Sequence, residues 1–364
     1  MKQGPHSLAL VLIARDEARC IARCLESVKP HVDRMLVLDT GSTDATPALA
    51  RAAGADVHYG TWNDDFSAAR NHALALADAD WNLVLDADEW LISGGADIAA
   101  LRWMAPTYAG RIRVDSEYDS DAELSVAPSW LTRVVPRGAR YTGRIHEQVD
   151  AAWPRRRIAV RIGHDGYHRA RQTGKRGRND RLLRMALDES PADAYLHYQL
   201  GKNLELATAW DAAAPHYETA YASGHPDDSW RHDLVLRLVY TLKKTCAFER
   251  AVLIADAEMA RWTHSPDYYF TLADLLLDWA TSEPERAKEL LPMIEASWQQ
   301  CLVLGDNPDL EGAVHGRGSF LAARNLAAFH ESLGHAEQAA RYARLEAELR
   351  QRRTAGRDTK EQPR

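Results

Sequence analysis

The sequence has little cysteine: four thiols, Cys20, Cys24, Cys246 and Cys301, occur among 364 residues. Cys20 and Cys24 lie one helical turn apart, a spacing at which a zinc site needs two further ligands elsewhere, so we interpret them as reduced thiols on a helix. Scarce cysteine and the lack of an export signal predict a cytoplasmic protein, and peripheral attachment at the inner face of a membrane stays open.

Long apolar runs and an excess of positive charge are also missing. The longest apolar run near the start, Leu8–Ala14, is far shorter than the roughly 18 residues of a membrane-spanning helix, so we expect no transmembrane segment. The formal net charge is −7, which argues against a general nucleic-acid binder because such proteins neutralise phosphates with a basic surface.

Three signature motifs are absent as well. No G-x-G-x-x-G or G-x-x-x-x-G-K-[ST] occurs, so dinucleotide-binding and P-loop proteins lack their phosphate cradle here. No H-E-x-x-H occurs either, because His146-Glu147 is followed by Gln148-Val149-Asp150.

The first half of the chain alternates strand-like and helix-like segments. Apolar runs over Leu8–Ala14, Met35–Leu38 and Trp81–Leu85, with a shorter one at Asp56–Tyr59, predict buried strands. Helical spacing between these runs predicts crossover helices, and therefore a largely parallel sheet. In such sheets ligands bind at the carboxyl ends of the strands.

From residue 96 to 168 the segments become shorter and more β-like. We expect strands over 111–114, 130–135, 144–149 and 158–162. The acidic stretch Asp115–Glu123 lies between two of them and is interpreted as a mobile loop, because it lacks the glycine and terminal glutamate of a calcium-binding loop.

The second half has the texture of paired helices. Similar helix starts recur near Tyr195, Trp230, Tyr268 and Ala322, and small residues stand where helices would cross, which is typical of tetratricopeptide-like repeats. We therefore predict an α/β domain over 1–168, a basic linker or lid over 169–190, helical repeats over 191–349 and a disordered tail over 350–364.

Two carboxylates, Asp86 and Asp88, follow the strand that ends at Leu85. Residues two apart can project toward one side of a strand end, and hard carboxylates there can hold Mg²⁺ or Mn²⁺ beside a diphosphate. The same pattern also fits an acidic surface turn. Asp39 ends another strand and could accept a hydrogen bond from a base or ribose, while Arg70 could clamp a diphosphate.

Four segments in order resemble the motifs of family-2 glycosyltransferases with the GT-A fold: Val11–Glu17, Val37–Asp44, Trp62–Asn71 and Trp81–Glu89. The resemblance covers roughly residues 7–170 and is closest to a subgroup with C-terminal tetratricopeptide repeats, which includes glycocin-type peptide glycosyltransferases and lipopolysaccharide-type sugar transferases. It implies a nucleotide site lined by Ala14, Glu17 and Asp39, ribose or diphosphate contacts from Arg70 and Asp86, and a metal held by Asp88. Many relatives have Asp-Asp where this chain has Asp39-Thr40.

The reaction implied by the resemblance is attack of an acceptor hydroxyl or thiol on the anomeric carbon with inversion, which needs one base. The subgroup carries a His-Glu pair after a glycine, matched here by Gly143–Glu147. Glu147 is the preferred base and His146 its competitor, with a solution pKa closer to neutrality. His164 is predicted as a third metal ligand, a phosphate contact or a structural residue, and the basic stretch with Arg178 as a lid or a solvated linker.

The sequence thus predicts a metal-dependent transferase that moves a hexose from a nucleoside diphosphate, UDP by preference, to a peptide acceptor. A transferase acting on a lipopolysaccharide or lipid-linked glycan is the alternative, and a non-catalytic repeat scaffold is the second. The repeats would bind the acceptor or form a homodimer.

Overall fold

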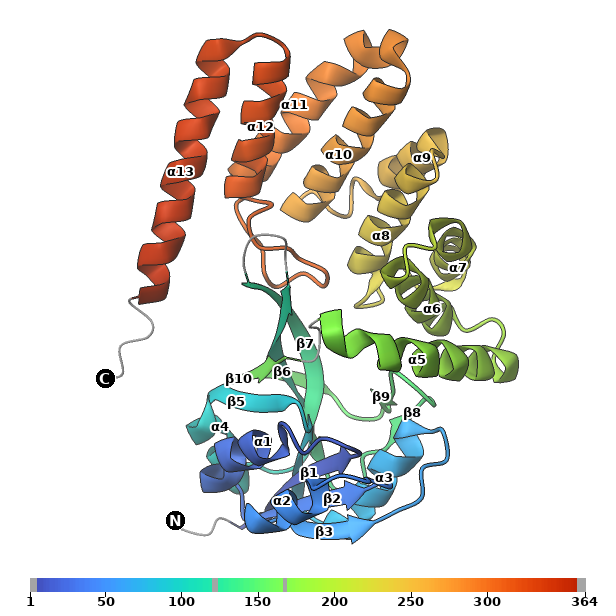
Figure 1. Ribbon diagram of the computed structural model, residues 1–364, viewed down its shortest axis with the longest axis vertical. Coiled ribbons are helices and arrows are strands. Elements are labelled where there is room, and N and C mark those ends of the chain that lie inside the picture. Colours follow the sequence, from blue (N-terminus) through green and yellow to red (C-terminus); the bar gives the residue numbers. More distant parts are fainter. Residues whose placement is uncertain (1–4, 120–123, 166–168, 359–364) are drawn as a thin grey trace. The chain divides into compact units, whose positions relative to one another are not determined.

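The computed structural model describes residues 5–119, 124–165 and 169–358, and the chain divides into two compact units, residues 1–191 and 192–364 (Figure 1). The first unit is a mixed α/β structure and the second is entirely helical among its described residues. The predicted fold class, an α/β domain followed by an all-α helical-repeat domain, is confirmed.

An eight-stranded sheet forms the centre of the first unit, in the order β3-β2-β1-β4-β7-β6-β10-β5. Its first four strands are parallel, whereas β7 runs antiparallel to β4 and β6, and β5 antiparallel to β10. The strands are β1 (Leu8–Ala14), β2 (Arg34–Asp39), β3 (Asp56–Tyr59), β4 (Trp81–Asp86), β5 (Glu89–Ser93), β6 (Ala109–Asp119), β7 (Leu124–Pro136) and β10 (Arg155–His164), and a separate pair joins β8 (Tyr141–Thr142) to β9 (Gln148–Val149).

Both faces of β1, β2 and β4 are buried, which is why they read as apolar runs, whereas the edge strand β3 is partly exposed. One face packs on α1 (Ile21–Val28), α2 (Thr46–Ala52) and α4 (Gly95–Ala100), and the other packs on α3 (Phe66–Ala77). Along β1, for example, Leu10 belongs to the first core and Val11 to the second. This double packing fixes the strand ends, where the candidate site lies.

Two predictions for the β-rich part were wrong. The acidic stretch was expected to be a loop from Asp115, but β6 continues to Asp119 because its backbone pairs with β7 along the whole hairpin. The strand expected over 144–149 is reduced to Gln148–Val149, because Gly143 and His146 adopt positive φ values of 95° and 51° that an extended strand excludes. Residues 120–123 of the acidic stretch lie outside the described part of the chain.

The basic stretch after the sheet forms a single helix, α5 (Arg169–Glu189). Leu182 and Leu183 on this helix are fully buried, and Ala186 is nearly so. The stretch that composition marks as a linker or lid is therefore a helix with a buried apolar stripe, and it belongs to the first compact unit.

The second unit consists of four helix pairs: α6 (Ala194–Leu206) with α7 (Trp210–Ser223), α8 (Arg231–Lys244) with α9 (Phe248–Glu258), α10 (Pro266–Ser282) with α11 (Ala287–Leu304), and α12 (Phe320–Ser332) with α13 (Ala336–Asp358). Each pair begins at one of the four starts read from the sequence. The last helix continues through residue 358, within the segment expected to be a tail, and none of the described helices is both long and apolar enough to cross a membrane.

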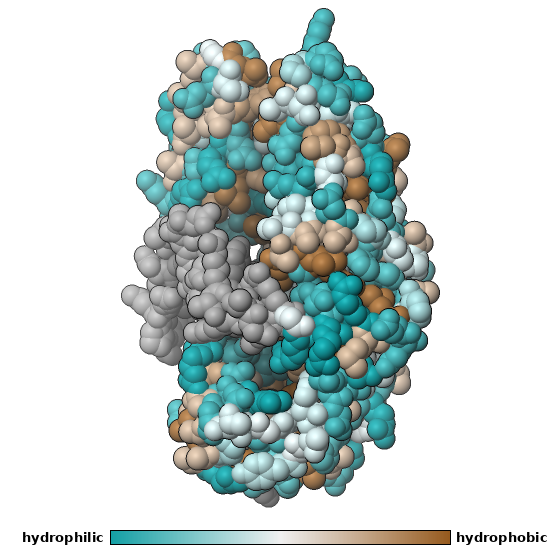
Figure 2. Space-filling view, turned by 45° about the vertical axis from the view of Figure 1, so that its right-hand side comes forward, coloured by the Kyte–Doolittle hydropathy of each residue, from teal (hydrophilic) through white to brown (hydrophobic). Residues whose placement is uncertain are grey.

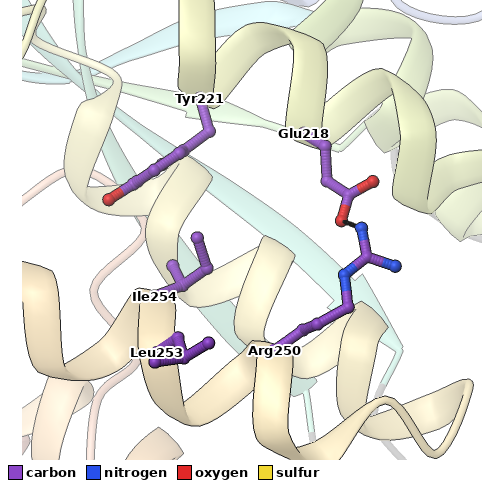
Figure 3. A pocket seen from close by; sticks show the side chains of 5 residues that line it. All are labelled: Glu218, Tyr221, Arg250, Leu253 and Ile254. Atoms are coloured by element: carbon purple, nitrogen blue, oxygen red, sulfur yellow. Dashed lines mark hydrogen bonds and ion pairs between the residues drawn. The ribbon is translucent and has the colours of Figure 1, made fainter.

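Figure 2 shows a face that is mainly hydrophilic, with hydrophobic residues in small separate groups. One pocket of about 380 Å³ lies between α7 and α9, lined by Glu218, Tyr221, Arg250, Leu253 and Ile254. In Figure 3 the side chains of Glu218 and Arg250 meet as an ion pair beside the apolar ones. The pocket holds none of the residues that the sequence marks for chemistry.

Candidate functional site

Side-chain hydrogen bonds join the loop that follows β1 to the loop that follows β2. The backbone N–H of Asp16 donates to Ser42, and the Asp16 carboxylate accepts from the backbone of Thr43 at 2.7 Å. The backbone N–H of Glu17 donates to the hydroxyl of Thr46 at 2.7 Å. Asp16 has a φ of 54°, which an aspartate tolerates better than most residues. The two loops therefore form one preorganised wall at the carboxyl edge of the sheet.

Asp39 lies at the base of this wall and is 1% exposed. Its Oδ1 accepts hydrogen bonds from the backbone N–H groups of Gly41 and Ser42 at 3.0 and 2.9 Å. Its Oδ2 is buried and has no hydrogen-bond partner among the described residues. Thr40, the residue after Asp39, donates its backbone N–H and its hydroxyl to the carbonyl oxygen of Ala14 at the end of β1. A buried carboxylate oxygen without a partner is an acceptor suited to a donor group of a ligand.

Arg70 on α3 connects two of the predicted site residues. It is 4% exposed; its Nη2 donates to Oδ1 of Asp86 at 2.7 Å, and its Nε donates to Oε1 of Glu147. The structure thus brings the proposed base and the first carboxylate of the Asp-x-Asp pair onto one guanidinium. In the described part of the chain, Oε2 of Glu147 makes no hydrogen bond.

Arg133 on β7 completes the row from the other side. Its Nη2 donates to Oδ2 of Asp86 at 2.7 Å and to Oε1 of Glu89 at 2.6 Å. Glu89 in turn accepts the backbone N–H of Asp86 at 2.8 Å. The result is a row of alternating charge, Glu147–Arg70–Asp86–Arg133–Glu89, in which each oxygen of Asp86 is bound to a different arginine.

The electrostatics of the row follow from burial and these ion pairs. Burial alone would raise the pKa of Asp86, but Arg133 and Arg70 hold it well below its usual range. Glu89 is 2% exposed, and burial raises its pKa despite the opposing effect of Arg133. Tyr141 packs beside the row, and burial raises the pKa of its phenol to about 12. Asp86 is therefore an anion over the whole physiological pH range.

The structure brings Asp88 and His164 together. Nε2 of His164 is 3.6 Å from Oδ2 of Asp88, and its Nδ1 is 3.1 Å from the hydroxyl of Ser116. Burial would lower the pKa of His164, but the contact with Asp88 raises it. Among the described residues no group of three or more His, Cys, Asp or Glu side chains is arranged to hold a metal ion. Asp86, predicted as a ligand, directs both oxygens at arginines instead.

The loop between β8 and β9 presents Glu147. His146, the competing base, has a φ of 51°, which costs free energy for a residue other than glycine and is tolerated where the surroundings determine it. In the same loop the backbone carbonyl of Arg144 accepts a hydrogen bond from the N–H of Phe66, at the start of α3, at 2.8 Å. The base loop is thereby fixed to the helix that carries Arg70.

Helix α5 lies against the same edge. Arg181 makes two bonds, of 2.8 and 2.7 Å, to the carboxylate of Asp64 in the loop before α3. One turn earlier, the guanidinium of Arg178 lies 5.2 Å from the ring of Phe66, and burial lowers its pKa against the opposing effect of nearby Glu17. Arg178 is exposed, and no ion pair joins it to any carboxylate of the described residues.

Sequence reasoning missed Arg133. The signal was present, because a single arginine inside the apolar run Trp130–Val135 must find a buried partner if the run is a strand. Glu89 stands at the end of the motif Trp81–Glu89, but no function was predicted for it. Their shared partner, Asp86, lies 47 residues before Arg133, and no local pattern encodes that distance.

Comparisons with known proteins place the site in a family. Residues 9–95, which carry β1 to β5 and Asp39, Arg70, Asp86 and Asp88, match the family model "Glycosyl transferase family 2". The first unit therefore contains a family-2 glycosyltransferase domain, which confirms the resemblance read from the motifs.

Several known proteins are similar to parts of this chain. A TPR repeat-containing protein of Synechococcus elongatus is 35% identical over 262 residues, covering 67% of this chain and 64% of the relative. The prophage-derived glycosyltransferase SunS of Bacillus subtilis is 38% identical over 89 residues, 24% of this chain and 21% of its own length. The chain thus spans less than two thirds of these relatives. The glucosyl-3-phosphoglycerate synthase structure of Mycobacterium tuberculosis, solved with Mn²⁺, UDP and glucosyl-3-phosphoglycerate, is 26% identical over 32% of this chain and 45% of that chain, with a TM-score of 0.25.

Proposed function

We propose that this protein is an inverting glycosyltransferase that moves a hexose from a UDP-linked donor to a hydroxyl or thiol acceptor, with Glu147 as the base. The observation that carries the proposal is the position of Arg70, which binds Glu147 and Asp86 at once. Because one buried guanidinium binds both Glu147 and Asp86, the proposed base lies next to the carboxylate on the donor side. This proximity is what transfer from donor to acceptor requires. The non-catalytic scaffold has no need of this arrangement.

The nucleotide would lie on the wall formed by the loops after β1 and β2. Asp39 Oδ2 is buried without a partner among the described residues, and the imide N–H of uracil is a donor of matching chemistry. Glu17 and Ala14 border the same wall. This fit favours a uridine nucleotide over one whose base presents only acceptors at that edge.

A divalent cation would be held by Asp88 and His164, with donor phosphates as its other ligands. The donor set fits Mn²⁺ or Mg²⁺, because such ions commonly take one or two protein ligands and complete their shell with phosphate and water. The contact of 3.6 Å between His164 and Asp88 places an imidazole and a carboxylate side by side. When bound, the cation would neutralise charge that develops on the leaving diphosphate.

The acceptor is proposed to be a peptide that carries Ser, Thr or Cys. The support is the second unit, because stacked helix pairs form extended surfaces that suit extended chains. A thiol acceptor would need weaker base assistance than a hydroxyl, because thiols ionise more readily.

A donor panel tests the proposal. The full chain is incubated with UDP-, GDP-, dTDP- and CMP-linked sugars and Mn²⁺ or Mg²⁺, and release of the nucleotide is measured. We expect turnover with a UDP-hexose, lost by about 10³-fold in Glu147→Gln while UDP binding is kept, because general-base assistance contributes about 10²–10⁴-fold. Absence of binding and turnover with every donor would contradict the proposal.

A further inference from the structure

A bulge in the β6–β7 hairpin presents Arg133. Gly110 on β6 pairs with Val134, and the next residue, Arg111, pairs with Thr132, so Arg133 is an extra residue without a partner on β6. A bulge of this kind turns one side chain away from the regular alternation of the strand. Val134 and Val135 on its carboxyl side are fully buried in the two cores, which fixes the bulge in place.

Arg133 is held more firmly than a surface ion pair. It is 9% exposed, and its Nη2 bridges Asp86 and Glu89. Glu89 is 2% exposed, and Arg133 is the only arginine that binds it in the described part of the chain, whereas the Asp86 side chain is 37% exposed. A buried anion that loses its partner is strongly unfavourable, and neighbouring groups rearrange to compensate.

The rearrangement would reach Glu147. Asp86 now gives Oδ1 to Arg70 and Oδ2 to Arg133, which fixes the plane of its carboxylate. With Arg133 gone, both oxygens of Asp86 are free for Arg70, and a guanidinium prefers to bind a carboxylate through two parallel bonds. The Nη1 of Arg70 has no partner among the described residues, so a fork through Nη1 and Nη2 would turn the guanidinium toward Asp86 and shift the Nε that binds Glu147.

We infer that Arg133 is a positioning residue for the transfer reaction: it acts through Asp86 and Arg70 to hold Glu147 in register with the Asp86–Asp88 strand end. The inference rests on the proposed function. It assigns to Arg133 a large effect on the rate of transfer and a small one on nucleotide binding, because Asp86 is the only donor-side residue among its contacts, and Asp39, Glu17 and Asp88 are not.

A double-mutant cycle tests this role. Turnover of the UDP-hexose and the Kd of UDP with Mn²⁺ are measured for wild type, Arg133→Met, Glu147→Gln and the double variant. We expect Arg133→Met to lower kcat by about 10²-fold, the usual cost of misplacing a reacting group by about 1 Å, with the Kd within about threefold. The double variant should be within about threefold of Glu147→Gln alone, because residues that act as one unit are not additive.

Two further variants separate positioning from general stability. Arg133→Lys should recover about tenfold of the lost kcat, because one ammonium can also bridge two carboxylates. Arg102 is an equally buried arginine, 4% exposed and paired with Asp33, and Arg102→Met should keep kcat within about twofold below its unfolding transition. If Arg133→Met does not fold, the cycle is run with Arg133→Lys, whose smaller loss must likewise vanish with Glu147→Gln.

The outcomes are distinct. Losses that multiply in the double variant, an unchanged kcat in Arg133→Met, or an equal loss in Arg102→Met would each overturn the role of Arg133. A wild-type chain without turnover would instead contradict the proposed function, and this role would fail with it.

Discussion

At the scale of single residues, the candidate site is defined by where each polar atom finds a partner. Asp86 has both oxygens bound to arginines, whereas Asp39 has one oxygen bound to backbone N–H groups and one that, in the part of the chain the structure describes, is buried without a partner. The first residue therefore holds the site together, and the second offers itself to a ligand.

The free oxygen of Asp39 leads to a direct prediction. In Asp39→Asn the amide oxygen can still accept from Gly41 and Ser42, but the amide nitrogen cannot accept from a uracil N–H. We expect the affinity for UDP to fall by 10-fold or more, the usual order for a hydrogen bond to a charged group, while the free energy of unfolding is not lowered. Calorimetric titration and urea unfolding measure the two quantities. Equal UDP affinity in both proteins would show that Asp39 does not face the base.

The site also shows what the sequence can and cannot predict at this scale. Asp39, Arg70, Asp86 and Asp88 were found because each stands at the carboxyl end of a strand or in a motif of recognisable order. The separate roles of these residues were not predicted, because they depend on Arg133. The bulge that orients Arg133 results from strand pairing between distant segments.

At the scale of elements, α5 is the helix whose role the sequence left open. Arg181 binds Asp64, and fully buried Leu182 anchors the following turn, yet Arg178 one turn earlier is exposed beside Phe66 and Glu17. Arg181 ties this helix to the loop before α3, and the exposed Arg178 beside it favours the lid interpretation.

The matched pair Arg178→Gln and Arg184→Gln tests the lid. Arg184 lies on the same helix but is paired with Asp180. We expect the first change to weaken UDP binding by about tenfold, and uridine binding not at all, because a guanidinium contributes through the diphosphate charge. The second change should be neutral within about twofold. If both changes altered the affinity for UDP equally, α5 would be a solvated linker and not a lid.

A glycine within α5 gives an independent prediction. An added Cβ at Gly177 meets no atom within 4 Å, and its φ lies outside the left-handed region. Gly177→Ala should therefore stabilise the helix by about 0.5–1 kcal/mol, because alanine loses less backbone freedom on folding than glycine. Hydrogen exchange along α5 reports this gain. Unchanged or faster exchange would mean that the helix is not formed there in solution.

At the scale of the whole molecule, the sequence predicted the two units well because each is built from a repeated local signal. Apolar runs such as Leu8–Ala14 are long enough to define buried strands, and the helix starts at Tyr195 and Trp230 are 35 residues apart, close to the period of tetratricopeptide-like repeats. The hairpin of β6 and β7 was underestimated, because its acidic half, starting at Asp115, is held by cross-strand pairing and not by its own composition.

The helical unit carries its own pH dependence. Asp267 in the first turn of α10 is 1% exposed and accepts the backbone N–H of Val314, and burial raises its pKa to about 6. The folded chain thus holds this proton more tightly than the unfolded chain, whose aspartates have a pKa of about 3.9. The free energy of unfolding should therefore fall by about 2–3 kcal/mol as the pH rises from 4 to beyond 6.

Asp267→Asn should remove this loss, because the amide oxygen can still accept from Val314 but carries no charge. Urea unfolding of both proteins between pH 4 and 7, followed by tryptophan fluorescence, gives the difference directly. Parallel curves for the two proteins would assign the pH dependence to other groups.

The central claim is that the edge formed by Asp39, Asp86, Asp88 and Glu147 transfers sugar from a nucleotide. The most direct measurement is the release of UDP from the UDP-hexose by the wild-type chain and by Asp88→Ala, each with Mn²⁺ and with excess chelator. The account predicts turnover by the wild type that chelator abolishes, and a loss of about 10²-fold or more in Asp88→Ala with an unchanged unfolding transition. Turnover by Asp88→Ala equal to that of the wild type, in the presence of Mn²⁺, would contradict it.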